Sequence, residues 1–377
     1  MNKKLLEMKK NIESLYLHFP FCRHLCNYCD FYKKVPKNRD LELNDFHGYL
    51  DAAYVEHEKL IKKNGYSWVP LKTLYIGGGT PSLWGLEGTR YLESFFIKNN
   101  IQLSSDCEFT LEVNPGSWSH EILSEWRKIG VNRFSLGIQS MDGQVIKNLD
   151  RVHTIDDVYE TLEYFHKENL NFSVDFMLGL PYSNDLKRDV ISELKRVLNY
   201  SPKHFSVYIL TVKNNYTHFA QLPNEEWIEK EYLDVADFLK NAGYSHYEVS
   251  NFALPGFESK HNLNYWKSST VAALGPSATG FLAEEKIRYK WKTKEAVLEE
   301  EILNNKEFEL EELYTSLRSI GINILEKIES NPQWNEVSHK WEEDGTAKIS
   351  NGHLSLTSKG FLLLDSLMND LFIKKLI

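Results

Sequence analysis

The sequence predicts an α/β protein built as an incomplete, TIM-like (β/α)6 barrel followed by a small C-terminal domain. Short β-rich apolar runs alternate with longer helical patterns, which is typical of βα units and a parallel sheet. Clusters of Gly, Pro, Cys and charged residues directly follow these runs, and barrel chemistry collects at the carboxyl ends of the strands. After about residue 280 the composition changes to Lys- and Glu-rich sequence that we expect to be helical from about Lys292.

Six strands are expected, and each is a short run rich in β-branched and aromatic residues. They are Ser14–Leu17, Thr73–Ile76, Phe109–Val113, Arg133–Ile138, Phe172–Met177 and Phe205–Tyr208. Helical patterns lie between the strands, and each is long enough to cross back over a sheet. They cover Asp45–Lys63, Thr89–Asn99, His120–Ile129, Ile155–Asn169 and Leu186–Leu198.

The C-terminal domain is expected to be helical or winged-helix-like. Two short strand runs, Ala347–Ile349 and His353–Leu356, flank Asn351-Gly352, which is a hairpin signal. A closing helix is predicted over Thr357–Phe372. We therefore predict two domains, 1–280 and 281–377, with a boundary that depends on composition alone.

Composition limits the function classes. A length of 377 residues with 42% hydrophobic content suffices for a packed core, and the formal charge of −9 offers no basic field for nucleic acid. The segment Met1–Asn11 is charged and lacks the apolar core of a signal peptide, and no stretch approaches the ~20 apolar residues that span a bilayer. We expect a cytoplasmic protein without an integral membrane segment, with peripheral membrane association left open.

Three of the four cysteines fall in one loop, Cys22-Arg-His-Leu-Cys26-Asn-Tyr-Cys29, which suits a reducing compartment and a metal site. A C-x3-C-x2-C loop can place three thiolates on three corners of a [4Fe-4S] cluster and leave the fourth iron open. The zinc alternative needs four closed ligands, and no second ligand pair follows. Simple packing cysteines are the other alternative, and the fourth cysteine, Cys107, is expected to be buried packing.

The stretch from Tyr16 to Cys29 resembles the opening of radical-SAM proteins of the oxygen-independent coproporphyrinogen III oxidase (HemN) group, which includes the HemW-type heme chaperones. The resemblance extends over nearly the whole chain. It implies a radical-SAM barrel, a HemN-C-like C-terminal domain, a [4Fe-4S] cluster on Cys22, Cys26 and Cys29, and bound S-adenosylmethionine (SAM).

The resemblance also implies which side chains and backbone groups face SAM. The run Gly77-Gly-Gly-Thr80 would let the backbone approach the amino and carboxylate ends of SAM, and otherwise it is a tight turn. Arg151 suits a carboxylate through its guanidinium fork, and otherwise it caps a helix. The implied cofactor-binding set is Tyr16, Tyr28, Gly78, Gly79, Thr80, Glu112, Gln139, Arg151 and Asp175.

Two carboxylates of this set have structural alternatives. Glu112 would accept hydrogen bonds from the ribose hydroxyls, and otherwise it is a solvated charge on the barrel rim. Asp175 lies inside an apolar run and needs a partner to offset its desolvation, so a structural ion pair is the alternative to contact with SAM. Tyr16 and Tyr28, which flank the cysteine loop, have the alternative of core packing.

Departures from the oxidase pattern favour the chaperone group. Phe31 stands where the oxidases carry a further cysteine, and only 13 residues precede Ser14, which leaves no room for the oxidases' N-terminal extension. The segment His261-Asn-Leu-Asn-Tyr-Trp266 resembles the H-N-x-x-Y-W signature of the HemW-type proteins. His261 would ligate heme iron, and Tyr265 and Trp266 would pack on the macrocycle.

The histidine assignment keeps its alternatives. A histidine near aromatic residues is otherwise a hydrogen-bonded core residue. His204 and His246 also lie close to motif segments, and the sequence does not rank them by geometry.

The expected function is that of a heme chaperone which binds heme, holds a SAM-linked [4Fe-4S] cluster and transfers heme to respiratory membrane proteins. The alternative is an oxygen-independent coproporphyrinogen III oxidase, and the acidic charge balance disfavours a tRNA modifier. No catalytic residue is assigned. Whether SAM is cleaved or only bound stays open, as does the oligomeric state, a homodimer included.

Overall fold

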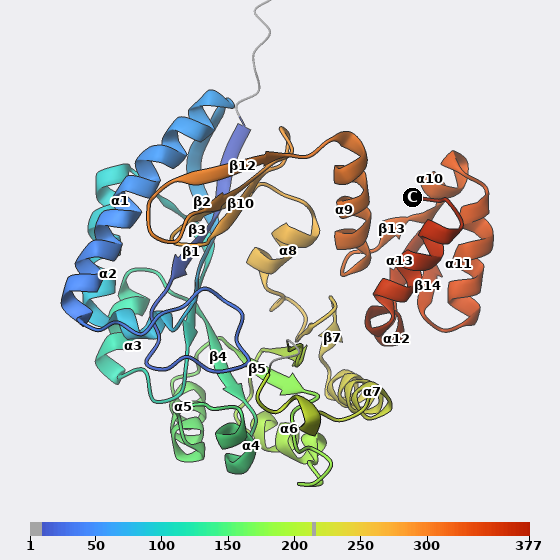
Figure 1. The fold of residues 1–377 in the computed structure, drawn as a ribbon, viewed down its shortest axis with the longest axis horizontal. Coiled ribbons are helices and arrows are strands. Elements are labelled where there is room, and N and C mark those ends of the chain that lie inside the picture. Colours follow the sequence, from blue (N-terminus) through green and yellow to red (C-terminus); the bar gives the residue numbers. More distant parts are fainter. Residues whose placement is uncertain (1–9, 213–215) are drawn as a thin grey trace, which may run out of the picture.

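The structure, a computed structural model, describes residues 10–212 and 216–377 (Figure 1). Residues 1–9, which form most of the charged N-terminal segment Met1–Asn11, lie outside the described residues. Within the described ranges, no helix is long and apolar enough to cross a membrane.

A nine-stranded sheet in the order β7-β8-β6-β5-β4-β3-β2-β1-β9 forms the barrel wall. Its six central strands are mutually parallel, and each contains a predicted strand, so the incomplete (β/α)6 barrel is confirmed. These strands are β1 (Lys10–Phe19), β2 (Tyr66–Gly78), β3 (Leu103–Val113), β4 (Arg133–Gln139), β5 (Phe172–Leu178) and β6 (His204–Ile209).

The crossover helices cover the outer face of the sheet (Figure 1). The five predicted helices are present as α1 (Arg39–Lys63), α2 (Gly85–Asn99), α3 (His120–Lys128), α5 (Ile155–Lys167) and α6 (Val190–Leu198). The last begins four residues later than predicted because the Asp189 side chain accepts from the backbone N–H of Ser192 and caps it there. The sequence did not predict η1 (Pro81–Trp84), α4 (Gly143–Asn148), η2 (Phe219–Gln221) and α7 (Glu225–Asn241).

Three short edge strands extend the barrel wall. At one edge β9 (Ala272–Leu274) pairs in parallel with β1. At the other edge β8 (Asn251–Ala253) and β7 (Ser245–His246) add antiparallel strands beside β6. The chain passes from one edge to the other through α8 (Lys260–Trp266), which therefore lies in the crossover between the two open edges of the half barrel.

A small antiparallel sheet follows the barrel, in the order β10 (Thr279–Leu282), β11 (Ile287–Trp291) and β12 (Leu298–Ile302). The prediction of a helix beginning near Lys292 is therefore wrong for Leu298–Ile302, which form β12. Its glutamates favour a helix by propensity, but cross-strand ion pairs such as Arg288 with Glu301 hold them in a strand. β11 contributes Tyr289 and Trp291 to the main core. The domain boundary near residue 280 stays a prediction.

A second core cluster lies in the C-terminal part, with members from Leu313 to Leu371. It is enclosed by α9 (Asn305–Leu317), α10 (Ile324–Ser330), α11 (Gln333–Glu343), α12 (Ser358–Leu362), α13 (Leu364–Ile373) and a sheet of β13 (Ile322–Asn323), β15 (His353–Leu356) and β14 (Ala347–Ser350). The predicted hairpin is confirmed, because Asn351 and Gly352 both have positive φ, 50° and 76°. The predicted closing helix is divided into two at Leu363.

Candidate cofactor site at the carboxyl ends of the strands

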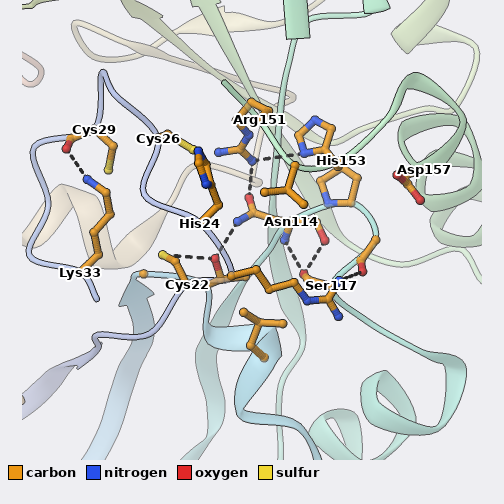
Figure 2. A pocket seen from close by; sticks show the side chains of 17 residues that line it. Cys22, His24, Cys26, Cys29, Lys33, Asn114, Ser117, Arg151, His153 and Asp157 are labelled. Carbon is orange, nitrogen blue, oxygen red and sulfur yellow. Dashed lines mark hydrogen bonds between the residues drawn. The ribbon is translucent and has the colours of Figure 1, made fainter. Parts of the chain in front are cut away.

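The cysteine loop follows β1 directly, and backbone hydrogen bonds join its two ends. Cys22 N–H donates to the Lys34 carbonyl (3.0 Å), and Lys34 N–H donates to the Pro20 carbonyl (2.8 Å). Cys22, Cys26 and Cys29 border one cavity of about 180 Å³, and Figure 2 shows their side chains around its open region. The predicted convergence of the three cysteines is therefore present in the fold.

The residues at this cavity fit an iron–sulfur cluster. Among the described residues, no three His, Cys, Asp or Glu side chains are grouped so that they could hold one metal ion. A cubane cluster binds its three thiolates at different irons, so its sulfurs need not converge on one point. Burial raises the pKa of Cys22, while the Thr80 hydroxyl, 3.6 Å from Cys22 Sγ, acts in the opposite direction. That donor suits a thiolate.

The glycine run after β2 supports the cysteine loop. Gly79 N–H donates to the Phe19 carbonyl (2.7 Å), and Thr80 N–H donates to the Phe21 carbonyl (2.8 Å). A Cβ at Gly79 would lie 2.6 Å from the Phe21 carbonyl oxygen, so only glycine permits this approach. These two backbone N–H groups, which the sequence suggested for SAM, are occupied by the cysteine loop.

A second cavity, of about 370 Å³, lies inside the barrel beside the first. It is lined by eight of the nine predicted cofactor residues: Tyr28, Gly78, Gly79, Thr80, Glu112, Gln139, Arg151 and Asp175. Tyr16 does not line either of these two cavities, because its hydroxyl is hydrogen-bonded to His18 Nδ1 (3.0 Å) and its ring packs beside Tyr75. A cavity of this volume is in the range of small-molecule sites.

Arg151 lines both cavities, and Figure 2 shows its side chain among the residues around the first of them. Its Nη2 donates to Asn114 Oδ1 (2.7 Å) and to the Gly137 carbonyl (2.8 Å), and its Nη1 donates to the Tyr28 hydroxyl (3.2 Å). Asn114 in turn donates to Thr80 Oγ1 (2.9 Å). The sequence did not single out Asn114, although its place directly after a strand and before a proline was a usable signal.

Two carboxylates face each other across the barrel cavity. Burial, followed by the charge of Asp175, raises the pKa of Glu112 from 4.5 to about 7. Burial raises the pKa of Asp175 from 3.8 to about 6, against a hydrogen bond from the Ser135 hydroxyl (2.9 Å). Glu112 accepts from the Tyr75 hydroxyl (2.9 Å) and from Gly78 N–H (3.0 Å). The sequence missed Tyr75, which lies inside an apolar strand run.

The predicted heme residues lie on α8 and line neither cavity, although the His261 ring lies 5.3 Å from the ring of Tyr75, which lines the barrel cavity. His261 is 1% exposed; its Nδ1 is hydrogen-bonded to Thr73 Oγ1 (2.9 Å) and its Nε2 to the Tyr265 hydroxyl (3.2 Å). Tyr265 is 38% exposed, and the Arg318 guanidinium lies 4.8 Å from the Trp266 ring. Both ring nitrogens of His261 are therefore engaged within the protein.

The two alternative histidines are also engaged within the protein. His204 is hydrogen-bonded to Ser173 Oγ (2.7 Å) and to the Tyr247 hydroxyl (2.8 Å). His246 Nδ1 is hydrogen-bonded to Ser358 Oγ (2.8 Å). Geometry therefore does not prefer either of them over His261 as a ligand.

Comparison with known proteins places this site in a family. Residues 16–194 match the radical SAM superfamily. The chain is 33% identical to the heme chaperone HemW of Lactococcus lactis over 342 residues, which cover 86% of each protein, and 34% identical to that of Bacillus subtilis over 280 residues, 72% of this chain and 71% of the relative. The fold superposes on coproporphyrinogen III oxidase (HemN) from Escherichia coli with a TM-score of 0.74, covering 97% of this chain and 91% of that one, at 19% identity. The chain therefore belongs to the HemW heme chaperone family within the radical SAM superfamily.

Proposed function

We propose that this chain is a heme chaperone that binds heme, holds a SAM-linked [4Fe-4S] cluster and transfers heme to respiratory membrane proteins. The observation that carries the proposal is its family membership, since relatives at 33% and 34% identity are named heme chaperones. Phe31 supports it, because this 69% exposed side chain occupies the position where the oxidases carry a further cysteine. The cytoplasm is the proposed compartment.

In this proposal Cys22, Cys26 and Cys29 are the cluster ligands. The cluster, when bound, supplies one iron that is open to an exogenous ligand. Arg151 is placed to clamp the SAM carboxylate, because its guanidinium lies at the boundary between the cysteine cavity and the barrel cavity. In the same proposal Glu112 accepts hydrogen bonds from the ribose hydroxyls, and Asp175 contacts SAM.

Heme contact is assigned to the α8 residues. Tyr265 offers an exposed aromatic face. A bond from His261 to heme iron requires the imidazole to leave Thr73 or Tyr265, so heme binding and the local structure of α8 are coupled. Three variants separate these contributions: Tyr265→Phe removes one hydroxyl, His261→Gln keeps a hydrogen-bonding group, and His57→Gln alters another buried histidine as a control.

One anaerobic experiment separates the chaperone from the oxidase. The cluster is reconstituted, and heme uptake and coproporphyrinogen III consumption are followed in the same sample with SAM present. Heme uptake without porphyrinogen consumption is expected. Decarboxylation of coproporphyrinogen in a protein that takes up no heme would replace the proposal with the oxidase function.

A further inference from the structure

Arg133, at the start of β4, is a buried residue whose guanidinium makes no hydrogen bond and no ion pair among the described residues. The residue is 3% exposed. Arginine stays protonated in proteins, so this charge does not neutralise itself. A buried charge without a counter-charge is unfavourable, and native folds rarely keep one without a function.

The Arg133 side chain points into the barrel lumen. Side chains alternate along a strand, so Arg133 shares a face with Ser135 and Gly137, which line the 370 Å³ cavity. Its charge also reaches the opposite wall: after burial, it is the second cause that lowers the pKa of His204 on β6 and of His261 on α8. The guanidinium therefore lies among groups from several sides of the lumen.

Those neighbours do not neutralise Arg133. His204 and His261 are neutral because burial and Arg133 lower their pKa values. The Asp175 carboxyl accepts from the Ser135 hydroxyl and is close enough for the Arg133 charge to lower its pKa, but no ion pair joins the two side chains. The wall of the lumen thus carries the positive charge of Arg133, and no negative group is in contact with it among the described residues.

A second unsatisfied donor lies beside Arg133. Thr110 on β3 is the ladder partner of Arg133, and residues paired across a parallel ladder point to the same face of the sheet. The Thr110 hydroxyl is buried, in a residue 0% exposed, and has no hydrogen-bond partner among the described residues. A guanidinium fork and a hydroxyl side by side are donors that suit one carboxylate.

We propose that Arg133 and Thr110 form a carboxylate-binding site in the barrel lumen, below the cavity that is lined by the cofactor residues. The site takes the carboxylate of an organic ligand that enters the barrel. Two sources share this chemistry: a propionate of heme, which rests on the proposed function, and the methionine carboxylate of SAM.

The first test uses the full chain with reconstituted cluster and a small probe. Thermal unfolding is followed in sodium propionate and in propionamide at matched ionic strength. Propionate should raise the Tm of the wild type, and propionamide, which has the same shape without the charge, should not. Arg133→Met should abolish the response, and Thr110→Val should weaken the affinity by ~10-fold, the effect of one hydrogen bond to a charged group.

The Tm of the variants without ligand distinguishes an arginine that binds a ligand from one that only supports the fold. If Arg133 awaits a ligand, Arg133→Met removes an uncompensated charge, so the empty protein should melt at a higher temperature than the wild type. Arg127→Met, on the exposed surface of α3, is the matched control and should leave the Tm and the propionate response unchanged. A wild type that responds alike to propionate and propionamide overturns the proposal.

Acid and ester pairs then identify the source. If heme supplies the carboxylate, wild type should bind heme ~30-fold more tightly than heme dimethyl ester, and Arg133→Met should bind both alike. If SAM supplies it, the same pattern should hold for SAM against its methyl ester. A wild type that binds no heme refutes the proposed chaperone function and leaves the propionate result standing. A wild type that discriminates neither pair refutes a carboxylate site for both ligands.

Discussion

Arg151 and His261 are both buried polar residues expected to touch a ligand, but the fold treats them differently. Arg151 lines two cavities and lies next to the cysteine loop, so its site is open before any ligand arrives. His261 is enclosed, and both of its ring nitrogens have partners within the protein. The cofactor end of the barrel is therefore preorganised, whereas the α8 end must rearrange before its histidine can bind a metal.

The strongest test of a preorganised cofactor end removes its thiolates. Replacing Cys22, Cys26 or Cys29 by alanine should abolish [4Fe-4S] assembly, because in the proposal each thiolate holds a different iron. The measurement is iron content and visible absorption after anaerobic reconstitution. Cys107→Ala is the matched control, since that cysteine is buried on β3 and lies outside both cavities. Normal cluster content in any of the three loop variants would remove the basis for a cluster site here.

The opposite end is tested through stability. His261→Ala should lower the free energy of unfolding by about 3 kcal/mol, because it leaves a cavity and strips two hydrogen-bond partners. Thr73→Val, which removes only one of those partners, should lower it by about 1 kcal/mol. Chemical denaturation without heme measures both. A His261→Ala variant as stable as the wild type would show that α8 is already loosely held, and the contrast with Arg151 would fail.

The proposed carboxylate clamp predicts a loss of SAM affinity. Arg151→Met should weaken SAM binding by ~30-fold, close to 2 kcal/mol, because a buried charge-assisted pair is lost. Isothermal titration on the reconstituted protein measures it, with Arg127→Met as the surface control. An unchanged affinity would indicate that the SAM carboxylate binds at Arg133 in the lumen and not at Arg151.

The last prediction concerns pH. The folded pKa of Glu112, about 7, lies above its ordinary 4.5, so the folded state holds a proton that the unfolded state releases. Stability from this group is fully present below about pH 4.5 and is lost as pH rises through 7, by about 3 kcal/mol in all. Asp175, with a pKa of about 6, adds to the same trend at lower pH. Denaturation of Glu112→Gln between pH 5 and 8 should give a flatter profile than the wild type, and an unchanged slope would refute the assignment.

The sequence predicted the barrel where its signals were long, and failed where they were short or contradictory. Each of the six central strands has at least six residues, but β7, β8 and β9 have only two or three residues each. The segment Leu298–Ile302 was misread because its glutamates favour a helix, and the cross-strand cations that hold it become visible only in three dimensions.

The same limit applies to the site. The cysteine spacing alone identified the three thiols that share a cavity. Arg133, Thr110 and Tyr75 were missed because their strands are buried on both faces, so polar and apolar residues do not alternate and the inward face cannot be read. Side-chain contacts between neighbouring strands, such as Tyr75 on β2 with Glu112 on β3, join residues that are 37 positions apart in the sequence.

The crossover that contains α8 controls the access of solvent to the barrel lumen from the side. No sheet ladder joins the two edge strands there, and α8 is attached by individual hydrogen bonds: Glu108 accepts from the backbone N–H groups of Lys260 and His261, and Asn264 donates to Ser14. Seven residues held in this way open at far less free energy than a central strand does. Amide hydrogens of α8 should therefore exchange with deuterium well before those of β2, and the side of the barrel would admit bulky ligands on that faster timescale.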